Sequence, residues 1–514
     1  MSALEDSPQA ASAAVIDVGS NSVRLVLYRL EGGALWTIYN EKVLAGLGRD
    51  LATTGRLSAD GVASALGALG RFRALLDAAR PERIFAVATA AIRDATDGPA
   101  FRRRAEEETG LELRVLSGKE EARYGALGVL AGAPASRGAV GDLGGASLEL
   151  TRLSEGLPAR GVSLPLGPFA LGEEGRFDSA RVRAAVTRHV DPIAPSFSAD
   201  TLNAVGGAWR NLALLHMKLS DYPLGIVHQY ELARREAVEA ARFVSQQSRG
   251  SLERIEGVSR RRVEALPHAA VVLEALIERL NIQRVVISAY GLREGLLREA
   301  FGPPILAADP LVAGCAALGG RPEAAEALGA GLQTWMAPAF AKLAPVFDAR
   351  EPVLLAAACR LADLGAQLHP DHRADLIFDQ VLRAPIAGMN HAERVFLACT
   401  VFARHTASNA PREPRTINRL LSPERLQRAR ALGAALRLGC DLSGRNPPLL
   451  AHARLDFKPS TVVVSAQEAW TAVLLGEHTA KRAATLAGLL ERDFKMRAVS
   501  LDAGARPSSP PARS

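Results

Sequence analysis

The chain has 514 residues, of which 48% are hydrophobic and 23% charged, so it can bury a sizeable core and is too long for one ordinary domain. Its 62 Lys and Arg residues against 55 Asp and Glu residues give a net charge of +7 spread along the chain, which excludes a disordered polyelectrolyte and permits an anionic partner. Most of the 62 are Arg, which binds phosphate in a bidentate fork, although a codon bias toward Arg explains the excess as a whole more simply.

Cysteine usage and the N-terminus point to a cytoplasmic protein. The four cysteines, at positions 315, 359, 399 and 440, form no CxxC pair, so the sequence predicts neither a disulfide framework nor a zinc knuckle. Residues 1–14 lack a basic n-region, and no apolar run reaches the roughly 18 residues that a membrane span needs. We therefore expect no export signal and no membrane partner.

The N-terminal third of the chain alternates between strand and helix patterns. Residues 13–28 consist of two β-rich runs on either side of a small polar turn, which predicts a hairpin. Residues 58–79 have apolar side chains at helical spacing, and residues 84–89, beyond Pro81, have the composition of a strand. This alternation favours an α/β sheet.

Residues 138–150 repeat the layout of the first hairpin. When Asp17 is aligned with Asp142, the first glycine and the last serine of the two polar turns also align. An internal repeat with an offset of 125 residues predicts two related halves, each of which opens with a strand, a turn of phosphate size and a second strand.

The remainder of the chain divides into a further α/β part and a helical part. We expect a helix over 179–190, a strand over 202–205, helices that begin at Asn211 and Glu231, a helix over 267–280 and a strand over 285–288. Helical spacing then dominates residues 309–445, and strand-like runs lie between 454 and 465. The predicted domains are 13–125 and 126–304, which are related α/β domains, a helical domain at 305–445, a small α/β end module at 446–502 and a disordered tail at 503–514.

The two polar turns have the composition of phosphate-binding loops. Small residues expose backbone N–H groups, and the hydroxyl and amide side chains add further donors. Asp17 and Asp142 end the preceding strands, where a carboxylate can hold Mg²⁺ or a water molecule beside the phosphate. Either turn alone is more simply an ordinary turn, since Asp, Asn, Gly and Ser are the usual turn residues, but the duplication favours phosphate binding.

Two charged residues between the turns are candidates for chemistry. Arg93 stands just past a strand end, where a phosphate could use both its guanidinium and a helix N-terminus, and the alternative is a surface pair with Asp94 or Asp97. Glu120 has the spacing of a capping box and needs no other explanation. Glu121 lies about 100° further round the same helix, near the strand tips, and is either a general base or a surface residue of a first helical turn.

Three further patterns carry weaker signals. Residues 205–212 and 290–295 are Gly-rich turns that contain Arg210 and Arg293, and either turn could serve only close backbone packing. The helical region holds several His and Asp residues but no His-Asp doublet, so we do not expect a metal site there.

The combined motifs resemble, in order and spacing, those of the exopolyphosphatase and guanosine pentaphosphatase family. The segments that carry the resemblance begin at Asp17, Ala88, Ser117, Asp142, Leu164, Val205 and Tyr290. The resemblance implies an α/β fold of two actin-like domains, of the ribonuclease H-like superfold shared by sugar kinases and heat-shock ATPases. It also implies a C-terminal α-helical HD-like domain and a small end module, although the region after residue 305 is less specific.

The resemblance also implies roles for particular residues. Glu121 matches the catalytic base, and Asp142 matches a carboxylate that orients water or binds metal. The implied ligands of Mg²⁺, or of another divalent ion or K⁺, are Asp17, Asp142 and Glu149. The implied phosphate-binding residues are Gly19, Ser20, Asn21, Ser22, Arg93, Gly144, Gly145, Ala146, Ser147, Gly207 and Arg210. The family usually has Gly at position 146 and Thr at position 148, and a Cβ at position 146 would crowd the phosphate if its φ had to be positive.

The implied activity is hydrolysis of the terminal phosphoryl group of inorganic polyphosphate, in which Glu121 takes the proton of an attacking water. The same chemistry on guanosine pentaphosphate (pppGpp) is an alternative that the sequence does not separate, which makes pppGpp and ppGpp alternative ligands. A sensor of pppGpp or polyphosphate without turnover, and a sugar or acetate kinase of the same superfold, are alternatives of other classes. The resemblance implies a homodimer, and we expect no nucleic acid partner.

Overall fold

The computed structural model describes residues 11–171, 177–254, 263, 265–306, 308–319, 322–407 and 411–500. The chain forms two compact units, Met1–Pro310 and Leu311–Ser514. The tail that we predict to be disordered, residues 503–514, lies outside the described residues.

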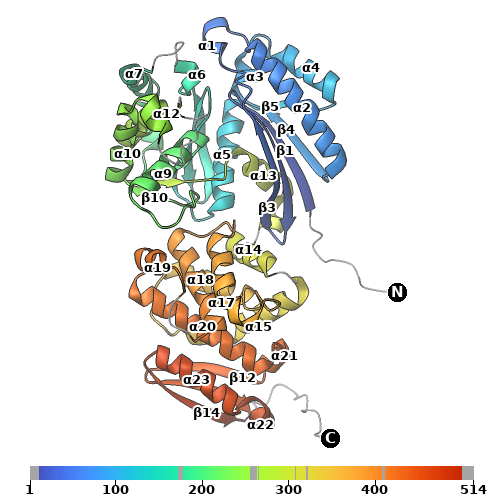
Figure 1. Cartoon of the computed structure of the whole chain (residues 1–514), viewed down its shortest axis with the longest axis vertical. Coiled ribbons are helices and arrows are strands. Elements are labelled where there is room, and N and C mark those ends of the chain that lie inside the picture. The colour runs from blue at the N-terminus through green and yellow to red at the C-terminus, as the bar shows by residue number, and fades with distance from the viewer. Residues whose placement is uncertain are drawn as a thin grey trace. The chain divides into compact units, whose positions relative to one another are not determined.

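The first sheet of the N-terminal unit has the strand order β3-β2-β1-β4-β5 (Figure 1). Its strands are β1 (Ala11–Val18), β2 (Val23–Glu31), β3 (Ala34–Val43), β4 (Arg83–Ala88) and β5 (Arg114–Val115). The first three strands are antiparallel neighbours, and β4 and β5 run parallel to β1. Its helices are α1 (Leu51–Thr54), α2 (Ala59–Ala79), α3 (Ala90–Asp94) and α4 (Gly98–Thr109). The predicted hairpin, helix and strand are therefore confirmed.

The second sheet repeats the plan of the first. Its order is β10-β11-β9-β6-β7-β8, so that β8, β7, β6, β9 and β11 have the neighbours and directions of β3, β2, β1, β4 and β5. The strands are β6 (Gly138–Leu143), β7 (Leu148–Ser154), β8 (Leu157–Leu164), β9 (Thr201–Val205), β10 (Glu231–Ala233) and β11 (Arg284–Ile287). The helices are α6 (Pro168–Leu171), α7 (Ser179–Val190), α8 (Ala194–Phe197), α9 (Gly207–Leu219), α10 (Arg234–Gln246), α11 (Arg249–Glu253) and α12 (Leu266–Arg279). The shared topology confirms the internal repeat.

Two predicted helix starts in this half were wrong. Residues Glu231–Ala233 form the edge strand β10, antiparallel to β11, and the helix begins three residues later at Arg234. Helix α9 begins at Gly207, four residues before Asn211, because Gly206 at φ 116° ends the strand and turns the chain. The backbone of Gly206 approaches Leu143 so closely that a Cβ would lie 2.5 Å from its carbonyl oxygen, which explains the glycine.

Helices α5 (Gly118–Gly132) and α13 (Leu292–Leu306) join the two halves. Helix α5 packs on β7 and β8 of the second sheet and on α13, while α13 places Leu296 and Leu297 in a core with Val15 and Val26 of the first sheet. The predicted boundary at residues 125 and 126 therefore falls inside a helix that contacts both sheets.

Glycines set the close approach of α5 and α13, which gives a stability prediction. A Cβ at Gly295 would lie 1.9 Å from the carbonyl oxygen of Tyr124, so Gly295→Ala should destabilise the N-terminal unit by at least about 2 kcal/mol. The matched control is Gly67→Ala in α2, where an added Cβ meets no atom within 4 Å and should stabilise by about 0.5–1 kcal/mol. Thermal unfolding of both variants measures the difference, and equal melting temperatures would contradict the close packing.

The C-terminal unit is helical and ends in a small sheet, as the sequence predicts. Its helices are α14 (Pro310–Leu318), α15 (Pro322–Phe340), α16 (Glu351–Arg360), α17 (Pro370–Arg383), α18 (His391–His405), α19 (Pro414–Leu420), α20 (Pro423–Ser443), α21 (Pro447–Leu450), α22 (Thr471–Leu474) and α23 (Glu477–Leu489). The sheet has the order β12-β13-β14, formed by Ala453–Lys458, Thr461–Gln467 and Asp493–Val499. Helix α23 packs on β13, β14 and α20.

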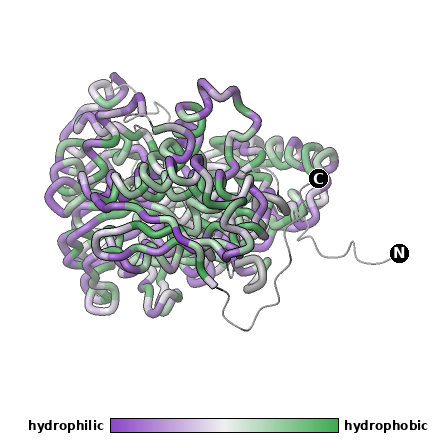
Figure 2. The backbone as a smooth tube through the Cα atoms, turned by 90° about the horizontal axis from the view of Figure 1, so that it is seen from below, coloured by the Kyte–Doolittle hydropathy of each residue, from purple (hydrophilic) through white to green (hydrophobic). Residues whose placement is uncertain are grey.

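Hydropathy alternates over short distances along the chain. In Figure 2 hydrophilic and hydrophobic segments follow each other closely. Within the described ranges, no helix is long and apolar enough to cross a membrane.

Candidate active site

The two polar turns have the same internal geometry. The N–H of Gly19 donates to the carbonyl oxygen of Ser22 at 2.9 Å, and the N–H of Gly144 donates to that of Ser147 at 2.9 Å. These four residues occupy aligned positions in the repeat, so the repeat extends to individual hydrogen bonds. Each turn lies at the tip of the first hairpin of its sheet.

In each half, the segment that follows the third strand returns to the turn and binds its carbonyl groups. In the first half, the N–H of Gly46 donates to the carbonyl oxygen of Asn21 at 3.1 Å, and that of Gly48 donates to Ser20 at 2.8 Å. In the second half, the N–H of Gly167 donates to the carbonyl oxygen of Ala146 at 3.1 Å, and that of Phe169 donates to Gly145 at 2.8 Å. Gly167 is required because a Cβ there would lie 2.4 Å from the carbonyl carbon of Ala146. Because these hydrogen bonds occupy the carbonyl groups of the turns, the N–H groups of the turns are available to bind a ligand.

The two turns face each other. A Cβ at Gly145 would lie 3.2 Å from the Cβ of Ser20 and 3.3 Å from the backbone nitrogen of Asn21. Among the described residues, the N–H groups of Ser20, Asn21, Gly145 and Ala146 donate to no protein acceptor. Ala146 does not have positive φ, so its departure from glycine causes no backbone strain. Opposed N–H groups of this kind suit the oxygens of a phosphate chain.

Acidic residues lie beside the turns. Asp142 and Glu149 are direct partners across β6 and β7, so their side chains share one face of the sheet. Burial, and next the charge of Asp17, raise the pKa of Asp142 to about 6. Burial raises the pKa of Glu149 well above its usual value, and the charges of Glu121 and Asp142 add to the shift. Carboxylates from both repeats therefore act on one another in a single cluster.

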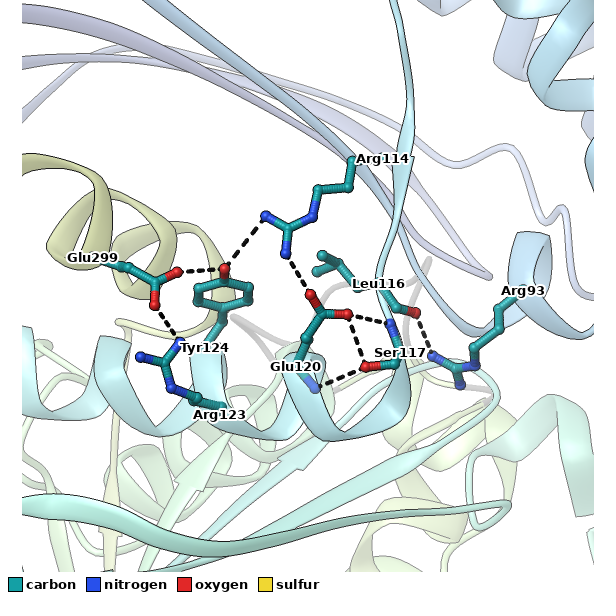
Figure 3. A network of polar contacts seen from close by, with 8 residues as sticks. All are labelled: Arg93, Arg114, Leu116, Ser117, Glu120, Arg123, Tyr124 and Glu299. Carbon is teal, nitrogen blue, oxygen red and sulfur yellow. Dashed lines mark hydrogen bonds and ion pairs between the residues drawn. The ribbon is translucent and has the colours of Figure 1, made fainter.

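The first turn of α5 places Glu121 at this cluster. Ser117 caps the helix and forms the predicted capping box with Glu120 (Figure 3). A Cβ at Gly118 would lie 2.6 Å from the Cβ of Ser163, whose hydroxyl donates to Glu149 at 2.7 Å, so the helix start lies beside Glu149. The side chain of Glu121 is 11% exposed, and burial raises its pKa to about 7.

Arg93 binds the candidate base. From α3, its Nη1 donates to Glu121 Oε2 at 2.9 Å, and its Nε pairs with Asp94 at 3.0 Å. Nη1 also donates to the carbonyl oxygen of Leu116 at 3.2 Å (Figure 3). A helix begins just past the end of β4, as the sequence predicts, and Arg93 lies in the last turn of this five-residue helix. The surface-pair alternative with Asp94 is also present, alongside the contact with Glu121.

Three arginines lie among the carboxylates. Arg293 donates to Asp17 Oδ2 at 3.0 Å, and the charges of Arg293 and Arg210 lower the pKa of Asp142 against the effect of burial. Burial, and then the charges of Arg293 and Arg210, lower the pKa of Arg24 to about 10. Arg24 was not predicted from the sequence, although its position opposite Asp17 in the predicted hairpin could have indicated it. The sequence also did not predict that Arg293 binds Asp17.

The remaining predicted residues are placed as follows. Gly207 begins α9, next to the close approach of Gly206 to Leu143, and therefore lies at the end of the strand that carries Asp142. In the helical unit, Asp363 pairs with Arg445 at 2.9 Å and His405 bonds the carbonyl group of Leu364. A search of the described residues finds no group of three or more His, Cys, Asp or Glu side chains arranged to hold a metal ion.

Comparisons with known proteins match both units. Residues 26–302 match the family model described as the Ppx/GppA phosphatase family, and residues 324–496 match that described as exopolyphosphatase, C-terminal. A curated relative, exopolyphosphatase 1 of Mycobacterium tuberculosis, is 28% identical over 327 residues, which are 60% of this chain and 95% of the relative.

Solved structures also resemble more than half of the chain. A crystal structure of the Aquifex aeolicus member of the Ppx/GppA family is 27% identical with a TM-score of 0.50, and the match covers 57% of this chain and 97% of that one. An exopolyphosphatase from Cytophaga hutchinsonii is 21% identical with a TM-score of 0.51, over 56% of this chain and 96% of that one, and shows a likeness of fold.

Proposed function

The chain belongs to the Ppx/GppA phosphatase family, and from that premise we propose that it is an exopolyphosphatase that releases orthophosphate from the end of an inorganic polyphosphate chain. The observation that carries the proposal is the position of Glu121, a buried carboxylate held by Arg93 next to the acidic cluster and the paired turns. The name of the mycobacterial relative supports polyphosphate as the substrate class.

The proposed reaction is an in-line attack of water on the terminal phosphoryl group. The N–H groups of Ser20, Asn21, Gly145 and Ala146 bind the phosphate oxygens, and Glu121 accepts a proton from the attacking water. The P–O bond to the rest of the chain breaks, and the leaving group is itself a phosphate that needs little protonation. Positioning and charge therefore supply most of the catalysis, as is usual for phosphoryl transfer.

We propose Mg²⁺ as the cofactor, with Asp142 and Glu149 as the main protein ligands. The fit rests on their shared face of the sheet and on their burial, which raises the pKa of both carboxyl groups. Mg²⁺ commonly takes one or two carboxylates and completes its shell with phosphates and waters. Asp17, the third predicted ligand, is ion-paired through Oδ2 with Arg293. Bound at this cluster, Mg²⁺ would neutralise charge on the phosphoryl oxygens.

Because Glu121 is the proposed general base, its protonation state should make the rate of hydrolysis depend on pH. A general base acts only when deprotonated, and burial raises the pKa of this carboxyl to about 7. We expect kcat/KM on polyphosphate to rise with pH through an inflection near 7 and then to level off. Initial rates across the pH range at constant ionic strength and saturating Mg²⁺ measure the profile. A rate that stays constant between about pH 5 and 9 would contradict the assignment of Glu121 as the base.

A paired substrate assay tests the proposed function. Phosphate release from long-chain polyphosphate and from pppGpp is measured with the same enzyme preparation, with and without Mg²⁺. We expect a higher kcat/KM on polyphosphate and loss of turnover when Mg²⁺ is removed by EDTA. A much higher kcat/KM on pppGpp would replace polyphosphate with the nucleotide, and binding of both without turnover would favour a sensor.

Finer features of the fold belong to the same proposal. The shared strand order of the two sheets supports their assignment to the actin-like superfold. The resemblance noted from the sequence also implies an HD-like character for the helical unit, whose residues 324–496 match the exopolyphosphatase C-terminal model. We also propose a cytoplasmic homodimer, for which sedimentation of the full chain and cell fractionation are the direct measurements.

A further inference from the structure

The Gly-rich segment 290–295 has no role in the reaction described above, yet it contacts acids of both repeats. A Cβ at Gly291 would lie 3.5 Å from Asp142 Oδ2, and Arg293 donates to Asp17 Oδ2 at 3.0 Å. Asp17 and Asp142 are equivalent positions of the internal repeat. The start of α13 therefore lies close to both of these acids, Asp17 of the first half and Asp142 of the second half.

A buried hydrogen-bond pair holds this segment. Glu294 is 8% exposed, and its Oε2 accepts from the N–H of Gly291 at 2.8 Å. Its Oε1 accepts from the hydroxyl of Tyr28, on β2 of the first sheet, at 2.6 Å. Burial, and next the charge of Glu294, raise the pKa of Tyr28 well above its usual value, so the hydroxyl remains a donor at any physiological pH.

We propose that Tyr28 and Glu294 are positioning residues: their hydrogen bond anchors the first turn of α13 to the first sheet and thereby holds Arg293 against Asp17 beside the paired turns. Arg293 is adjacent to Glu294 in sequence, so any rotation of this turn moves its guanidinium. A buried carboxylate that loses one of two donors needs another partner, and the charge of Arg293 already interacts with Glu294. Loss of the Tyr28 hydroxyl would then draw Arg293 away from Asp17.

The structure offers a matched control on the same helix. The hydroxyl of Tyr124, on α5, donates to Glu299 of α13 at 2.5 Å (Figure 3). This bond joins the same kinds of group and also anchors α13, but Glu299 lies five residues beyond Glu294 and its side chain is 39% exposed. Tyr124→Phe therefore removes a tyrosine–glutamate bond from α13 without disturbing the turn that carries Arg293.

The test compares Tyr28→Phe with Tyr124→Phe in the full-length enzyme, with long-chain polyphosphate and Mg²⁺. We expect Tyr28→Phe to lower kcat about tenfold with KM within about twofold, because displacement of a charged group at the reacting centre affects the transition state more than binding of a long substrate. Tyr124→Phe should leave kcat within about twofold at a comparable melting temperature. Hydrogen exchange should increase in the first turn of α13 only for Tyr28→Phe.

Several outcomes would overturn the inference. Equal kcat for the two variants, a rise in KM alone, or unchanged exchange at the start of α13 would each do so. Should Tyr28→Phe fail to fold, Glu294→Met provides the measurement: it removes the acceptors of both Tyr28 and Gly291 at a similar side-chain size, and wild-type kcat in that variant would refute the positioning role. The inference rests on the proposed function, which the same assay tests separately, since absence of wild-type turnover on polyphosphate refutes that function whatever the variants do.

Discussion

Replacement of Glu121 by Gln should lower kcat on polyphosphate by roughly 10²–10⁴-fold, the usual contribution of a general base. Gln keeps the size of the side chain and can still accept from Arg93, but it cannot take a proton from water. Because binding depends mainly on the turn N–H groups, KM should stay within about twofold. Phosphate release under saturating substrate, with a preparation free of contaminating phosphatase, measures the loss.

Glu120 provides the matched control for this prediction. It is the preceding residue, and its carboxylate serves the capping box of the same helix. Gln also forms capping boxes, so Glu120→Gln should retain wild-type kcat. If Glu121→Gln retained the activity of Glu120→Gln, the base would have to be another group.

Although Glu121→Gln should lower kcat, it should not lower the stability of the folded protein. The pKa of Glu121 in the folded protein is raised, so its ionised form destabilises the fold increasingly as the pH rises from the ordinary value for Glu to about 7. Glu121→Gln should therefore melt at an equal or higher temperature than wild type at about pH 8. An inactive variant of undiminished stability would separate a catalytic role from a structural one.

Replacement of Asp142 by Asn should lower kcat/KM by roughly 100-fold or more. Asn removes the charge that the proposed Mg²⁺ site needs and leaves Glu149 as the main carboxylate of the hairpin. The Mg²⁺ concentration for half-maximal rate should also rise. Titration of activity with Mg²⁺ measures both quantities.

The surface pair of Asp191 with Arg279, at 3.3 Å, supplies the control for this substitution. Asp191→Asn removes a carboxylate from the same half of the unit, and exposed ion pairs contribute little to stability. Its kcat/KM and Mg²⁺ requirement should match wild type. An Asp142→Asn enzyme with the Mg²⁺ requirement of this control would argue against Asp142 as a metal ligand.

Local patterns account for what the sequence predicted well. The hairpins that begin at β1 and β6 combine strand-forming residues with small residues, chiefly Gly and Ser, at the turn, and both signals lie within a short stretch of the chain. The third strand of each half was missed because its pattern is weak: β3 is largely half-buried or exposed along its length, and β8 contains both a proline and a glycine. Glu231 was misassigned because a three-residue edge strand leaves no periodic signal.

The sequence by itself determined the duplicated turns and the carboxylates near the ends of the strands, because each depends on residues close together in the chain. It identified Glu121 as the candidate base through the resemblance to a known family, since local spacing left a surface role open. Only the tertiary structure decided that Gly145 faces Ser20, that Arg93 binds Glu121 and that Arg293 reaches Asp17. The last pair is separated by 276 positions, and no local propensity encodes such a contact. It forms because packing of α13 on α5, with glycine at the crossing, brings the end of the second half onto the first sheet.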